Sequence, residues 1–151
     1  METALFRTFH NVKLNSNHQV YTLLSQLERL YNSNGDSLPE TVYVQIDGGS
    51  ENVNKTVLAM LALLVAKRVG GLRNIVLTRL PVGHTHEDID SIFGVISRWI
   101  FRKFVPNPQR YDFELRAALD KKKMDCDVID VFCVPDFESF ISPYVDESFA
   151  R

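Results

Sequence analysis

The feature that most constrains the fold is a strand–helix–strand pattern in the middle of the chain. Thr41–Ile46 is rich in β-branched and aromatic side chains, which favour a strand. Asn54–Val69 is almost entirely apolar, as a helix buried against a sheet would be, and Ile75–Leu80 has the composition of a second strand. Two strands joined through a helix run parallel in the same sheet. The pattern therefore predicts an α/β fold built on a parallel pair.

Polar side chains follow both of these predicted strands. Asp47 comes directly after the first strand and is followed by two glycines, and the segment His84–Asp90 comes shortly after the second. Because parallel strands end at the same edge of a sheet, we expect the two polar clusters to lie together there. Ligands of open α/β sheets commonly bind at that carboxyl edge. The spacing thus predicts a binding site.

The remaining elements are predicted from hydrophobic periodicity and from turn residues. Further strands are expected at Leu5–Leu14 and Val128–Val134, and further helices at Asn17–Tyr31, Glu87–Lys103, Tyr111–Lys123 and Asp136–Tyr144. In the helix after the histidines, the buried stripe is expected to consist of Ile89, Ile92, Phe93, Ile96 and Ile100. A chain of 151 residues is the size of one domain with a real core.

Composition excludes several classes of protein. The net charge of −2 argues against binding nucleic acid by bulk charge alone. No apolar run reaches the roughly 18 residues of a membrane span, and the first residues lack a signal-peptide pattern. Cys126 and Cys133 are therefore expected to be free thiols in a reducing, intracellular compartment.

Helix capping alone explains part of the histidine-containing segment. Thr85 is suited to an N-cap with Asp88 three residues later, which resembles a capping box with Asp in place of Glu. Glu87 and Asp88 also complement the positive end of the helix dipole. These three residues therefore need no ligand to account for them.

The two histidines of the segment and its last acid are not explained by capping. The chain has only four histidines, and His84 and His86 are two of them. At about 100° per residue, His86 and Asp90 lie on one flank of the predicted helix, whereas Asp88 lies on the opposite flank. Neutral imidazole and carboxylate are both metal ligands. We therefore favour a functional cluster over capping alone.

Asp47 has two interpretations that the sequence leaves open. A lone acid after a strand is often a turn residue or a helix cap, and the glycines that follow would suit either role. The same glycines would also allow close approach of a ligand. A carboxylate at a strand end is then suited to hold Mg²⁺ against a phosphate.

Basic residues recur in the second half of the chain. They are Arg98, Arg102, Lys103, Arg110 and Lys121–Lys123. They could contact phosphates, but they alternate with acids and form no clear stripe in sequence. We therefore favour their interpretation as solvated helix faces.

Two motifs of the chain resemble those of a known family. Val44–Lys55 (VQIDGGSENVNK) and Leu80–Asp90 (LPVGHTHEDID) resemble an uncharacterised, transposon-associated domain family of eukaryotes. That family is similar to the ribonuclease H-like catalytic cores of DDE transposases and integrases. The resemblance covers residues 17–144 and implies a single ribonuclease H-like α/β domain over residues 1–151, with a mixed sheet and flanking helices.

The resemblance also implies a function. Such cores carry out phosphoryl transfer on DNA with Mg²⁺ or Mn²⁺ held by acids, and a protein of this kind would act in the nucleus. Asp47 matches the second acid of the set, Asp90 best matches the third, and Asp88 comes next. His84 and His86 would be auxiliary metal ligands or would orient the acids. The residues implied around these ligands are Glu51, Asn52, Thr85 and Glu87.

The first acid of such a core has no match in the sequence. It should lie on a strand well before Asp47, and none of the acids available there lies in a predicted strand: Glu2, Glu28, Asp36 and Glu40. Either the chain is a partial domain that begins after this strand, or the site is degenerate. Catalysis therefore stays open, and the alternative is a domesticated, non-catalytic domain that binds nucleic acid or protein.

A weaker alternative is a metallohydrolase unrelated to DNA. The run His84–Asp88 matches the first part of the His-x-His-x-Asp-His signature of metallo-β-lactamase-like hydrolases. Ile89 replaces the last histidine of that signature, and no histidine follows His86. We therefore rank this alternative below the other two.

Overall fold

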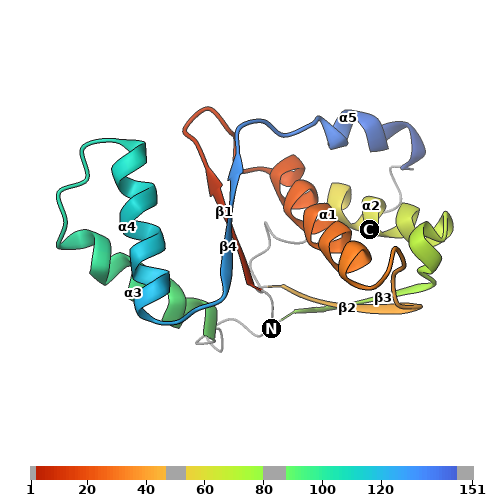
Figure 1. Cartoon of the computed structure of the whole chain (residues 1–151). Coiled ribbons are helices and arrows are strands. Elements are labelled where there is room, and N and C mark those ends of the chain that lie inside the picture. The colour runs from red at the N-terminus through yellow and green to blue at the C-terminus, as the bar shows by residue number, and fades with distance from the viewer. Residues whose placement is uncertain (1–2, 47–53, 80–87, 146–151) are drawn as a thin grey trace. The chain divides into compact units, whose positions relative to one another are not determined.

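The computed structural model describes residues 3–46, 54–79 and 88–145, and it has a mixed α/β fold with short strands and helices (Figure 1). The strands are β1 (Thr3–Thr8), β2 (Thr41–Ile46), β3 (Asn74–Arg79) and β4 (Cys126–Val131). The helices are α1 (Ser16–Ser33), α2 (Lys55–Ala66), α3 (Asp88–Phe101), α4 (Pro108–Lys121) and α5 (Phe137–Ile141), with short 3₁₀ helices at Val69–Gly71 and Ser142–Tyr144.

The chain divides into two compact units. One comprises Met1–Leu5 with Gly83–Ile129, and we call it the α3–α4 unit. The other comprises Phe6–Val82 with Asp130–Arg151, and we call it the β2–β3 unit. The described strands form two two-stranded sheets, β1 with β4 and β2 with β3. The single mixed sheet implied by the family resemblance is therefore not confirmed.

The predicted strand–helix–strand unit is confirmed. β2 and β3 pair in parallel, in a register that runs from Thr41 opposite Asn74 to Ile46 opposite Arg79 (Figure 1). The strand β2 has the predicted bounds, and β3 begins and ends one residue earlier than predicted. Both strands therefore end at the same edge of the sheet, as their sequence order required.

Helices α1 and α2 supply most of the core of the β2–β3 unit. Val20 of α1 packs with a group of α2 side chains: Val57, Ala59, Met60 and Leu61. A second cluster joins Leu27 of α1 to Val42 of β2 and to Leu72, which is 0% exposed. Burying each such side chain contributes about 1.5–3 kcal/mol. This packing holds the parallel strand pair in place.

The end of α2 differs from the prediction. The helix stops at Ala66 rather than at Val69, and Arg68 adopts a left-handed conformation with φ of 48°. Gly70, which follows the end of α2, lies too close to Tyr31 for a larger residue. A Cβ there would lie 3.0 Å from the Tyr31 ring, and its carbonyl accepts a hydrogen bond from the Leu38 amide at 2.7 Å.

The core of the α3–α4 unit lies between its two helices. Ile96 of α3 packs with Leu115 and Leu119 of α4, and Ile92 and Ile100 are partly buried against them, as predicted. Phe93 was predicted in this stripe, but it is 53% exposed. The buried positions are spaced by four, so the stripe is narrow. Phe93 lies about 100° round the helix from Ile92, outside that stripe. The predicted burial of Ile89 falls on a side chain outside the described ones.

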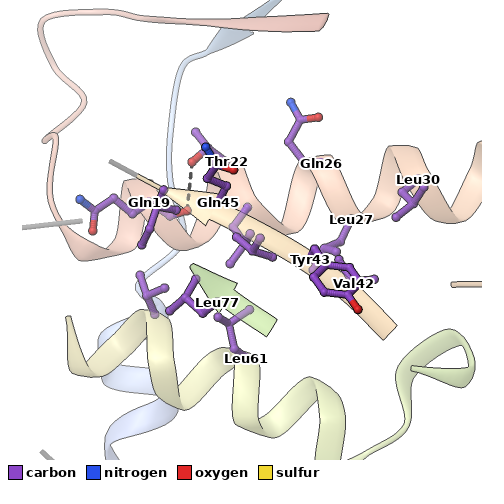
Figure 2. A pocket seen from close by; sticks show the side chains of 14 residues that line it. Gln19, Thr22, Gln26, Leu27, Leu30, Val42, Tyr43, Gln45, Leu61 and Leu77 are labelled. Carbon is purple, nitrogen blue, oxygen red and sulfur yellow. Dashed lines mark hydrogen bonds between the residues drawn. The ribbon is translucent and has the colours of Figure 1, made fainter. Parts of the chain in front are cut away.

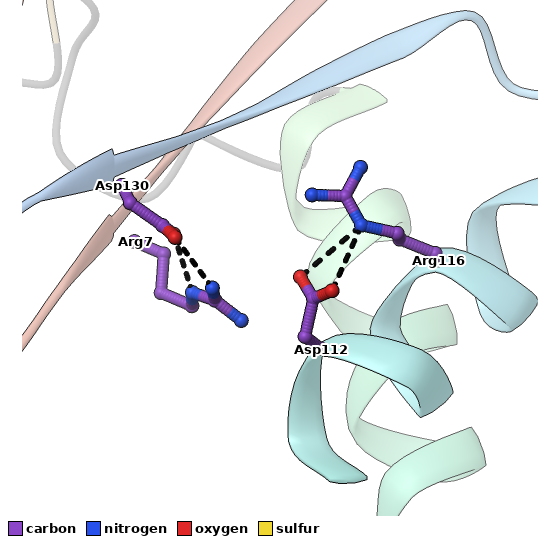
Figure 3. A network of polar contacts seen from close by, with 4 residues as sticks. All are labelled: Arg7, Asp112, Arg116 and Asp130. Carbon is purple, nitrogen blue, oxygen red and sulfur yellow. Dashed lines mark hydrogen bonds and ion pairs between the residues drawn. The ribbon is translucent and has the colours of Figure 1, made fainter. Parts of the chain in front are cut away.

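Strands β1 and β4 each begin two residues earlier than predicted, and each is shorter than predicted. β1 ends at Thr8, and β4 runs from Cys126 to Val131. Within the β2–β3 unit, the guanidinium of Arg7 donates two hydrogen bonds to the carboxylate of Asp130, at 2.6 and 2.7 Å (Figure 3). Such paired bonds are among the strongest in proteins. They tie the two strands together.

Helix caps follow the local sequence. Asn107 accepts a hydrogen bond from the Arg110 amide and Pro108 occupies the first turn, so α4 begins three residues before the predicted Tyr111. The side chain of Asp136 caps α5 by accepting a hydrogen bond from the Ser139 amide. Within α4, Arg116 pairs with Asp112 one turn away (Figure 3).

Two further expectations concern the chain's surroundings. Neither of the described residues Cys126 and Cys133 forms a disulfide bond, as predicted. Among the described helices, none is long and apolar enough to cross a membrane.

Candidate functional site

The candidate site is the edge where β2 and β3 end side by side. Ile46 and Arg79 are paired in register and are the last residues of their strands. Asp47 is the next residue after Ile46, and the segment with the two histidines begins a few residues after Arg79. The prediction that the two strands end at one edge is therefore confirmed, and the meeting of the two polar clusters there stays a prediction.

Most of the predicted site residues lie outside the described residues. These are Asp47, Glu51, Asn52, His84, Thr85, His86 and Glu87. Their roles, and the capping of the helix by Thr85, stay predictions. Of the predicted catalytic acids, Asp88 and Asp90 lie on α3, where Asp90 is exposed to solvent.

The donor chemistry of the predicted ligands fits a divalent ion. Asp47 and Asp90 would supply carboxylate oxygens, which suit both Mg²⁺ and Mn²⁺. His84 and His86 would supply imidazole nitrogens, which Mn²⁺ accepts more readily than Mg²⁺. Within residues 3–46, 54–79 and 88–145, no three His, Cys, Asp or Glu side chains converge as metal ligands. The candidate set therefore depends on residues beyond those ranges.

A pocket of about 620 Å³ runs along β2 as far as Ile46, the residue before Asp47. Figure 2 shows α1 on one side of the pocket and β2 on the other. The labelled side chains are Gln19, Thr22, Gln26, Leu27 and Leu30 from α1, Val42, Tyr43 and Gln45 from β2, with Leu61 and Leu77. The pocket is mainly apolar along its length, with amide side chains of both elements among its polar groups.

Asn54 anchors the polypeptide where α2 begins. Its side-chain oxygen accepts a hydrogen bond from the Val57 amide at 3.0 Å, which caps the helix. Its side-chain nitrogen donates to Gln19 of α1 at 2.6 Å. The connection 47–53 therefore joins a strand end held by the sheet to a helix start held by α1.

His18 is a histidine to which the sequence patterns assign no role. Its Nε2 is buried and has no hydrogen-bond partner in the described part of the chain. Burial lowers the pKa of His18, because the charged imidazolium is less well solvated than the neutral ring. The ring is therefore held neutral at neutral pH, on the turn of α1 next to Gln19.

The basic residues of α3 and α4 converge to a degree that the sequence did not indicate. Their predicted exposure is confirmed, yet five of them line one pocket around Trp99: Arg98, Arg102, Lys103, Lys121 and Lys122. The spacing of Arg98 and Arg102 by four residues is a signal that could have placed them on one helix face. The contribution of α4 depends on how the two helices pack, which charge alternation does not reveal.

Comparison with known proteins gives one match. The family model described as a domain of unknown function (DUF7869) matches residues 1–150. Neither the curated proteins nor the solved structures contain a match to the chain.

Proposed function

We propose that this chain, which belongs to the DUF7869 family of domains of unknown function, has an integrase-like role. It would take part in divalent-metal-dependent phosphoryl transfer on DNA. The domain would derive from a mobile element, have a ribonuclease H-like fold and act in the nucleus. The link to transposases rests on the two sequence motifs around Asp47 and His84. In its degenerate form the domain would keep the metal site without catalysis.

The observation that carries the proposal is the parallel pairing of β2 and β3. It brings the ends of the two strands, at Ile46 and Arg79, to neighbouring positions. The first motif, Val44–Lys55, runs through the end of β2, and the second, Leu80–Asp90, begins directly after β3. Metal-dependent chemistry at the carboxyl edge of a sheet needs this arrangement, because one ion must be reached from two separate segments.

The roles of the residues follow from their chemistry. Asp47 and Asp90 would bind the ion through carboxylate oxygens, and Asp88 is the alternative acid on α3. When bound, such an ion polarises a phosphoryl oxygen and lowers the pKa of a bound water. His84 and His86 would complete the ligand set or orient the acids.

The rival function is a non-catalytic domain that binds nucleic acid with the same fold. Two observations favour it. No acid before Asp47 matches the first acid of a transposase core, and the α3–α4 unit carries a basic pocket that involves none of the predicted metal ligands. Metal dependence of the activity on DNA separates the two functions.

The test is nicking of supercoiled plasmid DNA by the full chain, with Mn²⁺, with Mg²⁺ and with EDTA. A competent domain nicks the plasmid with either ion, and Asp47→Asn abolishes nicking, whereas Glu28→Gln does not. Glu28 is a suitable control because it is an exposed acid on α1. Binding of Mn²⁺ without nicking identifies the degenerate form. Absence of both Mn²⁺ binding and nicking would contradict the proposal.

A further inference from the structure

Helices α3 and α4 carry a surface pocket of about 500 Å³ lined mostly by cations. Five of its eight lining residues are basic and none is acidic. The basic ones are Arg98 of α3, Arg102 and Lys103 directly after α3, Lys121 at the end of α4, and Lys122 directly after it. The other three are Val95, Trp99 and Ala118. Such a concentration of one charge contrasts with the net charge of −2 of the whole chain.

Trp99 contacts both α4 and the cations that line the pocket. Its indole Nε1 donates a hydrogen bond to Glu114 at 2.9 Å, which fixes the ring against α4. The ammonium groups of Lys103 and Lys121 lie 4.9 and 4.7 Å from the centre of the ring. Each cation–π contact at such an exposed site contributes about 0.5–1 kcal/mol. One aromatic ring thus draws cations from both helices into the same place.

The acid beside the pocket does not neutralise it. Glu114 is only 2% exposed, and it already pairs with Arg110 and, at 4.0 Å, with Lys103. Within the described part of the chain, no ion pair forms with Arg98, Arg102, Lys121 or Lys122. These four cations are therefore exposed to solvent, and no ion pair within the described residues balances their charge. Their mutual repulsion would be relieved by an anionic ligand.

We propose that this basic pocket binds phosphate groups of a nucleic-acid backbone. Arg98 lies in the last turn of α3 and Arg102 directly follows the helix, and each guanidinium can bind a phosphate through two hydrogen bonds. Lys121 and Lys122 add charge from α4 and the residue after it. Cations spread over two helices suit a chain of phosphates better than a single one.

This pocket requires neither the predicted metal ligands nor catalysis. It is built wholly within the α3–α4 unit, from described residues. Binding of nucleic acid there would persist in EDTA. The proposal and the metal-dependent function can therefore fail separately.

The experiment uses the fluorescence of Trp99, which is the only tryptophan in the chain. The full chain is titrated in EDTA with a short labelled DNA, as duplex and as single strand, while Trp99 emission and the anisotropy of the label are followed. We expect a saturable change in both signals, with at least one DNA form. The variant Arg98→Gln/Arg102→Gln should bind at least tenfold more weakly. The slope of log K against log salt should fall by about 0.7–0.9 for each lost phosphate contact.

The matched control is Lys13→Gln/Lys67→Gln, which removes the same charge from exposed positions outside the pocket. It should bind DNA like the wild type. Circular dichroism tests whether each variant is folded. If the Arg98→Gln/Arg102→Gln variant is not folded, Lys122→Gln, at an exposed position after α4, is used in its place.

Four results would overturn the proposal. They are the absence of saturable DNA binding, equal weakening by the control pair, full competition by inorganic phosphate at concentrations equal to those of DNA phosphate, and binding to phosphatidylserine vesicles without binding to DNA. The second result would indicate attraction by bulk charge, the third a site for a single phosphate, and the fourth a membrane surface as the partner.

Discussion

Among the described residues, Glu114 is the only charged side chain that is buried. It lies on α4 and accepts a hydrogen bond from Trp99, while Arg110 and Lys103 balance its charge. Its burial could not be foreseen, because Trp99 is on another helix and nothing in the sequence links the two. Glu114 therefore joins α4 to α3 and also fixes Trp99, which lines the basic pocket.

The role of Glu114 predicts a difference between two substitutions. Glu114→Leu leaves the indole N–H of Trp99 without its acceptor and should lower the free energy of unfolding by about 1–3 kcal/mol. Glu114→Gln keeps an acceptor oxygen and should cost less. Urea denaturation measures both, with Glu28→Leu at an exposed position of α1 as the control. Equal stability of the two variants and the wild type would refute this role.

His18 predicts a pH dependence of stability. Its pKa in the folded chain lies below the ordinary value, because burial disfavours the charged ring. Below about pH 6.5 the unfolded chain binds a proton that the folded chain does not. The free energy of unfolding should therefore fall as the pH drops from about 6.5 toward the lowered pKa of His18. Above about pH 6.5, the stability that comes from keeping His18 neutral should be fully present.

The measurement is urea denaturation of wild type, His18→Leu and His10→Leu at pH 7.5 and at pH 5. The stability of His18→Leu should depend less on pH than that of the wild type. His10 is an exposed histidine that precedes α1, so its variant controls for the loss of an imidazole. Identical pH dependence in all three proteins would show that His18 is not the cause.

Among the helix termini, the start of α2 makes the most informative contacts. Asn54 caps the helix and also bonds to α1 through Gln19. Asn54→Ala removes both interactions and should cost about 1–2 kcal/mol for the cap and about 0.5–1.5 kcal/mol for the second bond. Asn54→Asp keeps the cap acceptor and should lose less.

Thermal unfolding compares these variants with Asn15→Ala, which removes only the cap of α1. We expect Asn15→Ala to be less destabilising than Asn54→Ala. The reverse order would mean that the bond between Asn54 and Gln19 contributes nothing to stability.

The elements also show which kinds of information the sequence carries. β2 has its predicted bounds because a β-branched run ends abruptly at Asp47 and two glycines. The early end of α2, which is followed by the left-handed conformation of Arg68, and the exposure of Phe93 have no comparable local signal. Local pattern therefore predicts the strand pair, and tertiary packing decides where the helices stop and which face they bury.

The same distinction between local pattern and tertiary packing applies to the candidate sites of the protein. The parallel edge follows from element order alone, so its position beside the two motifs could be predicted. The basic pocket could not, because its residues come from two helices whose packing brings them together. The net charge of the chain gave no indication of the basic pocket, because the chain has more acidic than basic residues in total.

In the function that we propose, Asp47 and Asp90 would bind one metal ion. The most direct test is calorimetric titration of Mn²⁺ into the full chain, with Asp47→Asn, Asp90→Asn, the double variant, and the exposed control Asp125→Asn. Ligands of a shared ion act as a unit, so their losses should not add. We predict that each single variant binds Mn²⁺ at least tenfold more weakly, that the double variant loses little more, and that the control binds like the wild type. Unchanged binding in both single variants, or independent and additive losses, would contradict the claim.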